Sequence, residues 1–484
     1  MADDKQNIVM FPFMAQGHII PFLALALQLE KISNHYNIII ANTPLNITKL
    51  RSSLPPHSAV TLIELPFSST DHGLPPNTEN TDTVPYTLVI KLIQASTSLK
   101  HPFKNLIQSL RSHKLCIIAD IFFGWTATVA KDLGVFHAFF SGCGGYGLAC
   151  YYSLWTNLPH RRVDSSDFTL PDFPEARALH VTQLPANIAE ADGTDPWSVY
   201  QREDNFSHWV NSDGFLFNSV QELDSVGLSY FKRIFNRPVW PIGPVLLSTG
   251  NGSRGKGGGI NPDLCREWLN KKPENSVLFV CFGSMNTISA SQMMQLGTAL
   301  ERCGRSFVWV VRPPIGFDIN AEFRAEEWLP EGFAEKVLES GRGLIVHDWA
   351  PQVEILSHSA VSAFMSHCGW NSVVESLSEG VPILGWPMAA EQFFNCKFLE
   401  EEVGVCVEVA RGKKCEVKWE DLVGKIELVM DESEKGIGMR KKACEIRDLI
   451  RGAKKDKDGS SVKALDEFLA AAAAISSKPK TNGT

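Results

Sequence analysis

Residues 349–392 read WAPQVEILSHSAVSAFMSHCGWNSVVESLSEGVPILGWPMAAEQ. Within this stretch an apolar strand pattern at 361–365 runs into the turn SHCGWNS at 366–372, and a helical pattern follows at 373–377. A strand, a tight turn and a helix in this order leave free N–H groups and the positive end of the helix at the turn. The stretch therefore predicts a Rossmann-like unit that holds a phosphate-bearing ligand.

The turn is also rich in side-chain donors. His367, Asn371 and Ser372 lie on it, and Ser284, after Gly283, would add a hydroxyl from the neighbouring loop. The alternative interpretation is a capped helix beside a buried histidine, but the density of donors favours an anion site.

Outward from this stretch, short β-branched runs alternate with amphipathic helical stretches, a pattern typical of parallel α/β sheets. We expect two Rossmann-like domains with parallel sheets facing across a cleft. The first spans 1–247 and the second 261–459. Expected strands are at 8–11, 37–40, 115–118, 136–140 and 215–217 in the first domain, and at 276–281, 307–311, 344–346, 361–365 and 381–385 in the second.

The segment between the two domains, 248–260, reads STGNGSRGKGGGI and predicts a flexible linker. A glycine-rich phosphate loop is the rival interpretation, but no strand leads into this segment and no GK[ST] follows. A last helix at about 460–475 is expected to pack back near the first domain. The residues after it predict a disordered tail.

Bulk composition restricts the partners and the compartment. The 484 residues carry a net charge of −8 with a pI near 5.9, which argues against a nucleic-acid partner. No stretch offers about 18 uncharged apolar residues, the length of a membrane span, and the polar N-terminus does not resemble a signal peptide. The 11 cysteines show no CxxC pairs, so we expect reduced thiols in a cytoplasmic protein. We also expect a monomer.

The 349–392 segment resembles, almost position for position, the signature box of plant secondary-product glycosyltransferases, which use UDP-sugars and have the GT-B fold. The resemblance continues in FPFMAQGHIIP at 11–21, WPIGPV at 240–245 and CFGS at 281–284. It implies inverting transfer of glucose from UDP-glucose to a hydroxyl of a small lipophilic acceptor, such as a flavonoid, another phenolic or a terpenoid. The product would be a β-glucoside.

The resemblance also assigns roles within the box. Trp349 would stack on the uracil, Ala350 would read the base edge through its backbone, and Gln352 would lie near the nucleoside. Glu375 would accept the ribose hydroxyls, and Trp370 would border the sugar. Glu391 and Gln392 would bind the sugar hydroxyls, with Gln392 typical of members that prefer glucose.

The catalytic pair comes from the first domain. Transfer to a hydroxyl requires a base, and His18 in GHIIP matches the family's catalytic histidine. In an isolated sequence such a histidine is more often structural. Asp120, at the end of an expected strand, occupies the position of the carboxylate that orients the imidazole, although it could instead cap the following helix.

The acceptor pocket and the absence of a metal complete the expectations. Apolar residues near the first strands predict a lipophilic pocket formed by Pro12, Phe13, Met14, Phe122, Phe123, Tyr146, Leu148 and the segment 184–200. No metal or other cofactor is expected, because the helix end meets the diphosphate charge and the DxD pair of Asp456 and Asp458 lies in a lysine-rich run. Two alternatives are a catalytically silent sugar-nucleotide-binding protein and a dinucleotide-dependent oxidoreductase, although the first loop lacks G-x-G-x-x-G.

Overall fold

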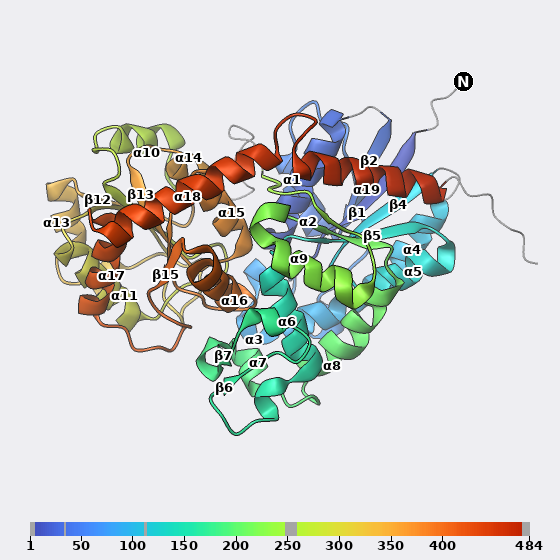
Figure 1. Ribbon diagram of the computed structural model, residues 1–484, viewed down its shortest axis with the longest axis horizontal. Helices are drawn as coiled ribbons and strands as arrows, with labels where there is room; N and C mark the ends of the chain where they lie inside the picture. Colours follow the sequence, from blue (N-terminus) through green and yellow to red (C-terminus); the bar gives the residue numbers. More distant parts are fainter. Residues whose placement is uncertain (1–4, 33–34, 111–113, 247–258, 477–484) are drawn as a thin grey trace, which may run out of the picture.

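The computed structural model describes residues 5–32, 35–110, 114–246 and 259–476. Most of the expected linker, residues 248–258, and the tail from 477 lie outside the described residues. Figure 1 shows two lobes, the first half of the chain on the right and the second half on the left. Each lobe is built around one sheet, as the alternating sequence pattern predicts.

The first half forms a seven-stranded sheet in the order β3-β2-β1-β4-β5-β8-β9, and every pair of neighbours is parallel. The strands are β1 (Gln6–Phe11), β2 (Tyr36–Asn42), β3 (Thr61–Glu64), β4 (Leu115–Asp120), β5 (Phe136–Ser141), β8 (Gly214–Phe217) and β9 (Val239–Pro241). A two-stranded antiparallel hairpin, β6 (Asp167–Phe168) and β7 (Leu179–His180), lies outside this sheet.

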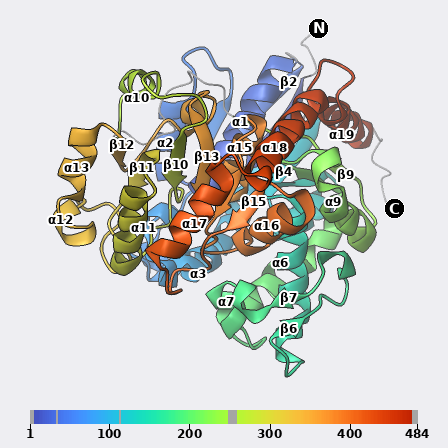
Figure 2. The ribbon, with the colours of Figure 1, turned by 60° about the vertical axis from the view of Figure 1, so that its left-hand side comes forward.

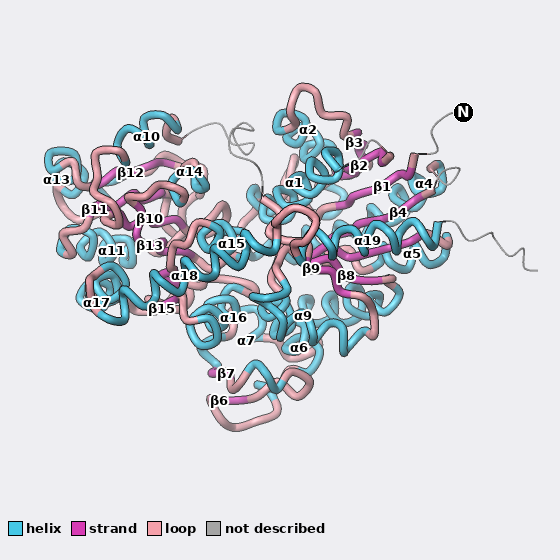
Figure 3. Tube along the Cα trace, turned by 45° about the horizontal axis from the view of Figure 1, so that its top comes forward, coloured by secondary structure: helices cyan, strands magenta, loops and turns pink. Residues whose placement is uncertain are grey.

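The second half forms a six-stranded parallel sheet in the order β12-β11-β10-β13-β14-β15. Its strands are β10 (Val277–Cys281), β11 (Ser306–Val311), β12 (Gly343–His347), β13 (Val361–Ser366), β14 (Ile383–Gly385) and β15 (Cys406–Glu408). Figure 3 shows the strands of the two sheets in separate lobes. This is the expected fold, two Rossmann-like units of the GT-B type.

Helices connect the parallel strands, as crossover connections require. Those of the first half are α1 (Gln16–Ile32), α2 (Pro44–Ser53), α3 (Tyr86–Ala95), α4 (Lys100–Ser109), α5 (Trp125–Leu133), α6 (Gly145–Asn157), α7 (Ala186–Glu190), α8 (Pro196–Val199) and α9 (Gln221–Phe235). Those of the second half are α10 (Pro262–Leu269), α11 (Ala290–Arg302), α12 (Ala325–Trp328), α13 (Phe333–Ser340), α14 (Gln352–Leu356), α15 (Trp370–Ser378), α16 (Gln392–Lys397) and α17 (Trp419–Met430).

The last two helices connect the lobes. α18 (Glu434–Ala453) packs on α15 and α17 of the second half, and α19 (Ser460–Ser476) packs on β9, β5 and β4 of the first. Figures 1 and 2 show this pair running from one lobe to the other. Phe468 of α19 is fully buried beside Trp240 and Phe136, so the end of the chain completes the core of the first half.

One apolar cluster is shared by both halves. It joins Tyr146 and Phe173 of the first half to Phe398 and Trp370 of the second, and Tyr146 stacks on Phe398 with ring centroids 4.8 Å apart. Such a shared core holds the two sheets in one orientation. Among the described residues, no helix is both long enough and apolar enough to span a membrane.

Candidate active site

A cleft of about 330 Å³ lies between the two sheets and is lined by residues of both. It opens at the carboxyl ends of β1 and β4 in the first half and of β10 and β13 in the second. In both sheets these neighbouring strands mark the point where the strand order reverses, and ligands bind there in open α/β sheets. The volume is sufficient for a small-molecule ligand.

His18 faces the cleft from the first turn of α1, which follows β1. Its Nδ1 lies 2.8 Å from Oδ2 of Asp120, the last residue of β4. Asp120 is 1 % exposed, and its other oxygen, Oδ1, accepts a hydrogen bond of 3.0 Å from the backbone N–H of Phe122. Asp120 therefore holds the imidazole and its own loop at the same time.

The charge on this pair is set by burial and by two carboxylates. Burial lowers the pKa of His18, but the charge and hydrogen bond of Asp120, together with the charge of Glu391, leave the pKa raised above 6.5. With Nδ1–H donated to Asp120, the free electron pair of the neutral ring is on Nε2. This arrangement forms an oriented base at the edge of the cleft.

Opposite this pair, the turn after β13 holds His367 at the start of α15. The imidazole fits between Gly283 and Gly369, because a Cβ on Gly283 would lie 2.7 Å from it and a Cβ on Gly369 would overlap it. Burial, followed by the positive charges of Arg312 and Lys413, lowers the pKa of His367 to about 4. The ring is therefore neutral at pH 7, and its buried Nδ1 has no hydrogen-bond partner in the structure.

Three predicted donor-site residues form a small polar cluster. Nε2 of Gln352 donates to Oε2 of Glu375 over 2.7 Å and to Oγ of Ser372 over 3.0 Å. Glu375 is only 3 % exposed, and the three side chains line the cleft together. The sequence places Glu375 one turn after Asn371, and the structure adds Gln352 as the residue that fixes its carboxylate.

Two neighbouring residues of α15 contact the first half. Nδ2 of Asn371 donates to the backbone oxygen of Gly17 over 2.8 Å. The indole N–H of Trp370 donates to the backbone oxygen of Asn218 over 2.7 Å, and its ring packs against Gly144, where a Cβ would lie 2.8 Å away. The turn at 366–372 and the start of α15 are thus attached directly to the first turn of α1, which carries His18.

Glu391 and Gln392 lie at the start of α16 on the same cleft. Oε1 of Gln392 accepts hydrogen bonds from the backbone N–H groups of Met388 (3.1 Å) and Ala389 (3.0 Å), so its amide NH₂ is the part left for a ligand. Burial raises the pKa of Glu391, although the charge of His18 opposes that shift.

Trp349 and Ala350 line the cleft directly after β12, and Ser284 lines it after β10. Arg312, which the sequence analysis missed, connects these two loops. Its guanidinium donates to the backbone oxygen of Gly283 over 2.7 Å and to that of Asp348 over 2.8 Å. Its position at the end of β11, beside the strand that leads to Ser284, is a signal from which it could have been found.

The expected acceptor pocket needs correction in four positions, and Pro12 is the first of these, because it is buried and does not line the cleft. Phe13 and Phe122 line the cleft, with ring centroids 5.0 Å apart. Met14, Phe123 and Tyr146 do not line it and are buried in the core. Phe123 stacks on Phe11 at 4.3 Å. These residues alternate along the chain with residues that line the cleft, so their side chains point to the side of the loop or helix that faces the core. Leu148 and Trp197, the latter in the expected segment 184–200, do line this part, and the lining also includes Ile20, Val84, Val89, Ile93, Ile121 and Tyr151.

Metal ligands are a separate question. Among the residues that the structure describes, one group lies close enough to share an ion, namely Cys368, Cys396 and Cys406, whose Sγ atoms are all within 4.8 Å of one another. These thiols are buried and do not line the cleft, although Cys368 belongs to the turn at 366–372. They are therefore not placed to contact a ligand in it.

Two facing parallel sheets with an oriented histidine on one and an anion-binding turn on the other define a sugar-nucleotide glycosyltransferase of the GT-B class. Residues 252–440 match the family model described as UDP-glucoronosyl and UDP-glucosyl transferase. Because it is also 53% identical over 97% of its length to a plant UDP-glycosyltransferase, the chain belongs to this family and is a UDP-glycosyltransferase. Membership decides against the oxidoreductase considered as an alternative.

Relatives and solved structures agree with this assignment. The chain is 53% identical to UDP-glycosyltransferase 92A1 of Arabidopsis thaliana, over 97% of this chain and 98% of that protein. It is 43% identical to crocetin glucosyltransferase 3 of Crocus sativus, over 89% and 92%. Its fold is similar to that of Glycyrrhiza uralensis UGT73P12, solved with glycyrrhetinic acid 3-O-monoglucuronide, with a TM-score of 0.83, 29% identity and coverage of 97% and 96%.

Proposed function

We propose that this enzyme transfers glucose from UDP-glucose to a hydroxyl group of a small lipophilic acceptor, with inversion at the anomeric carbon. The observation that carries the proposal is the hydrogen bond between His18 and Asp120 at the edge of a cleft whose other side is the donor-site turn. A base and a nucleotide site facing each other is the arrangement that a direct displacement needs.

In this reaction Nε2 of His18 takes the proton of the acceptor hydroxyl while the oxygen attacks the anomeric carbon. The bond from that carbon to the UDP oxygen breaks, and the electron pair leaves with the diphosphate. Asp120 keeps the imidazole in the required tautomer and stabilises its positive charge. Because attack and departure occur on opposite faces, an α-linked donor gives a β-glucoside.

The donor is proposed to lie along the second sheet. Trp349 stacks on the uracil, Ala350 binds its edge, and Glu375, fixed by Gln352, accepts the ribose hydroxyls. The diphosphate meets Ser284, His367, Asn371, Ser372 and the N-terminus of α15, and Glu391 and Gln392 bind the sugar. The neutral His367 and the free helix N–H groups support this assignment, because both act as hydrogen-bond donors to an anion.

The acceptor is proposed to be a phenolic, flavonoid or terpenoid-like aglycone. The wall beside His18 is apolar and aromatic, including Phe13, Phe122, Leu148 and Trp197. Crocetin glucosyltransferase 3 is a relative named for crocetin, and Phytolacca americana UGT2, 25% identical with a TM-score of 0.75, was solved with UDP-2fluoro-glucose and pterostilbene. Both names support a lipophilic acceptor for this chain.

Several sequence predictions remain proposals. The domain boundaries at 247 and 261 are supported by the separation of the two sheets, and the return of 460–475 to the first domain by the packing of α19. The monomeric state, the cytoplasmic location and the independence from metal also stay predictions.

The test is incubation of the protein with UDP-glucose and a mixed library of phenolic and terpenoid aglycones, followed by mass spectrometry. We expect products heavier than an aglycone by one hexose, whose anomeric proton coupling in NMR identifies a β-linkage. Binding of UDP without any glycosylated product would favour a silent sugar-nucleotide-binding protein. An α-linked product would contradict the inverting mechanism.

A further inference from the structure

Lys413 reaches the cleft from an unexpected direction. It lies in the loop between β15 and α17, more than 40 residues after the turn at 366–372 that leads into α15. It nevertheless lines the same cleft as His367, Ser284 and Gln392. Its neighbour Lys414 is exposed. Two adjacent lysines of the loop therefore have different surroundings, and only the first faces the proposed donor site.

The backbone on the N-terminal side of Lys413 is held in place. The N–H of Gly412 donates to the backbone oxygen of Pro387 over 2.8 Å, and the indole N–H of Trp386 donates to the oxygen of Gly412 over 3.3 Å. Gly412 has a φ of +80°, a conformation that glycine adopts without strain. Trp386 and Pro387 lead into the segment that carries Gln392, so the lysine loop and the sugar side of the cleft share one support.

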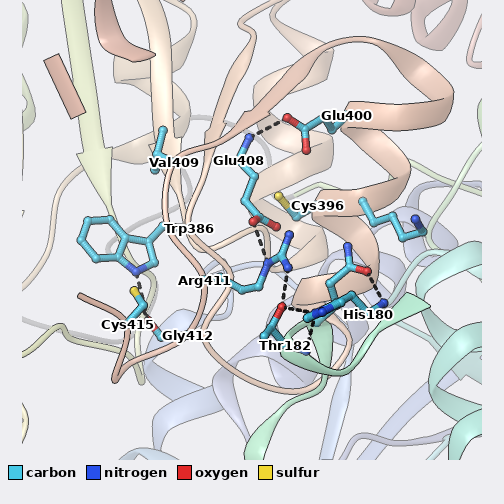
Figure 4. A network of polar contacts seen from close by, with 12 residues as sticks. His180, Thr182, Trp386, Cys396, Glu400, Glu408, Val409, Arg411, Gly412 and Cys415 are labelled. Atoms are coloured by element: carbon cyan, nitrogen blue, oxygen red, sulfur yellow. Dashed lines mark hydrogen bonds and ion pairs between the residues drawn. The ribbon is translucent and has the colours of Figure 1, made fainter. Parts of the chain in front are cut away.

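Arg411 fixes the loop from its other side, as Figure 4 shows. Its Nε donates to Oε1 of Glu408 over 2.7 Å, and a terminal nitrogen donates to Oγ1 of Thr182, in the first half, over 2.6 Å. The same view shows Cys415 beside Gly412. A loop held at Arg411, Gly412 and Cys415 leaves little freedom for the backbone of Lys413.

The electrostatic surroundings fit an anionic ligand. The charge of Lys413 acts on His367, at the donor-site turn, together with that of Arg312. The guanidinium of Arg312 is engaged with the backbone oxygens of Gly283 and Asp348, which makes it a brace between two loops. Lys413 lines the same cleft, and its charge lies close enough to His367 to lower the pKa of that ring, on the side to which a UDP-sugar would bring its diphosphate.

We propose that Lys413 is a donor-binding residue whose ammonium group pairs with the diphosphate of the UDP-sugar, in addition to the helix end and the side chains of the family motif. The inference rests on the proposed donor site. It assigns to this chain a charged contact from outside the 349–392 segment. A lysine acts here as a point charge, which suits a phosphate group.

The experiment measures the binding of uridine, UMP and UDP by calorimetry to the wild type and to three variants, each checked for folding by circular dichroism and thermal unfolding. In Lys413→Met we expect the Kd for UDP to rise by about tenfold to hundredfold and the Kd for uridine to stay within about twofold. Lys413→Arg should retain most of the UDP affinity. Lys414→Met is the matched control and should bind UDP like the wild type.

The salt dependence gives a second readout. UDP binding to the wild type should weaken with added salt more steeply than UDP binding to Lys413→Met, because one ion pair has been removed.

Several outcomes would overturn the inference. Unchanged UDP affinity in Lys413→Met, or an equal loss of uridine and UDP, would show that the ammonium does not meet the phosphates. Lys413→Gln repeats the comparison if the methionine variant is unstable, and failure of both to fold would make Lys413 a structural residue. If the wild type itself binds no UDP, the proposed donor site fails instead.

Discussion

At the residue scale, two carboxylates act on His18. Asp120 is hydrogen-bonded to its Nδ1, and the charge of Glu391 is near enough to raise the pKa of His18. We predict that His18→Ala lowers kcat with UDP-glucose by about 10²- to 10⁴-fold, the usual contribution of a general base. UDP affinity should remain, because the nucleotide contacts come from the second sheet. The exposed His57→Ala is the control. Comparable turnover by His18→Ala on an unactivated alcohol would remove His18 from the mechanism.

The pH profile gives a separate prediction for Asp120. His18 must be neutral to accept a proton, so activity falls as the pH drops through its raised pKa. In Asp120→Asn the favourable charge is lost while burial, which lowers the pKa, remains. The acidic limb of kcat/KM against pH should therefore move to lower pH, and kcat should fall less than in His18→Ala. If the acidic limb did not move and turnover stayed at the wild-type value, the only role left for Asp120 would be the hydrogen bond that it accepts from the Phe122 N–H.

Donor selectivity is predicted to depend on Gln392. Its Oε1 holds the backbone of Met388 and Ala389, so the amide NH₂ is the group that reads the sugar. Galactose has an axial C4 hydroxyl, and a poorly satisfied buried group costs about 1–3 kcal/mol. UDP-glucose should therefore exceed UDP-galactose about tenfold to hundredfold in kcat/KM, and Gln392→His should narrow this gap.

A closer variant separates the two functions of the amide. Gln392→Glu keeps an acceptor for the two backbone N–H groups and removes the NH₂ donor. We expect it to fold normally and to raise the KM for UDP-glucose. Competition between UDP-glucose and UDP-galactose then gives the ratio of their kcat/KM values. Equal use of both sugars by the wild type would show that selectivity lies elsewhere.

At the element scale, the N-terminus of α15 is expected to replace a metal ion. Its free N–H groups and the donor side chains around His367 meet the diphosphate charge. We predict that EDTA leaves the rate of glucose transfer unchanged. Loss of most activity with EDTA, followed by recovery with magnesium or manganese, would contradict this prediction. Cys368, Cys396 and Cys406 face away from the cleft, so an ion on them would not substitute.

The elements also show what the sequence could predict. All ten expected strands are present. Besides the small hairpin of β6 and β7, three strands of the two main sheets were missed, β3, β9 and β15, and all three are at sheet edges. Edge strands are short and need no continuous apolar run: β3 reads TLIE and β9 ends in Pro241. Central strands are buried on both faces and are apolar throughout, which makes them easy to recognise.

Site residues were predictable where a motif fixes them along the chain. His18, Asp120 and the residues of the 349–392 segment are local to strand ends, and the structure brings them to the two sides of one cleft. Lys413 lies on a loop that reaches the cleft only after folding, so its role has no local signal, whereas Arg312 was signalled only by its position at the end of β11. Phe123 and Tyr146 have the expected composition for the acceptor wall, but their rings point into the core.

At the scale of the whole molecule, the two lobes are joined by α18 and α19. Phe468 of α19 is fully buried, with its ring 5.4 Å from that of Trp240 and 6.0 Å from that of Phe136. We predict that Phe468→Ala destabilises the first half by about 3–5 kcal/mol, the usual cost of emptying such a site. Glu467→Ala, at the exposed neighbour, should have little effect. Thermal unfolding with and without UDP would measure both, and equal stability of the two variants would contradict the packing of α19.

The return of α19 to the first sheet also sets an order of events during protein synthesis. Domains generally fold from the N-terminus as the ribosome delivers them. Here the sheet made first has a surface, around Trp240 and Phe136, whose cover in α19 is translated more than 200 residues after β9. A nascent chain must therefore keep that surface from aggregating until α19 has left the ribosome, and truncation before residue 460 would harm the half of the protein that was already made.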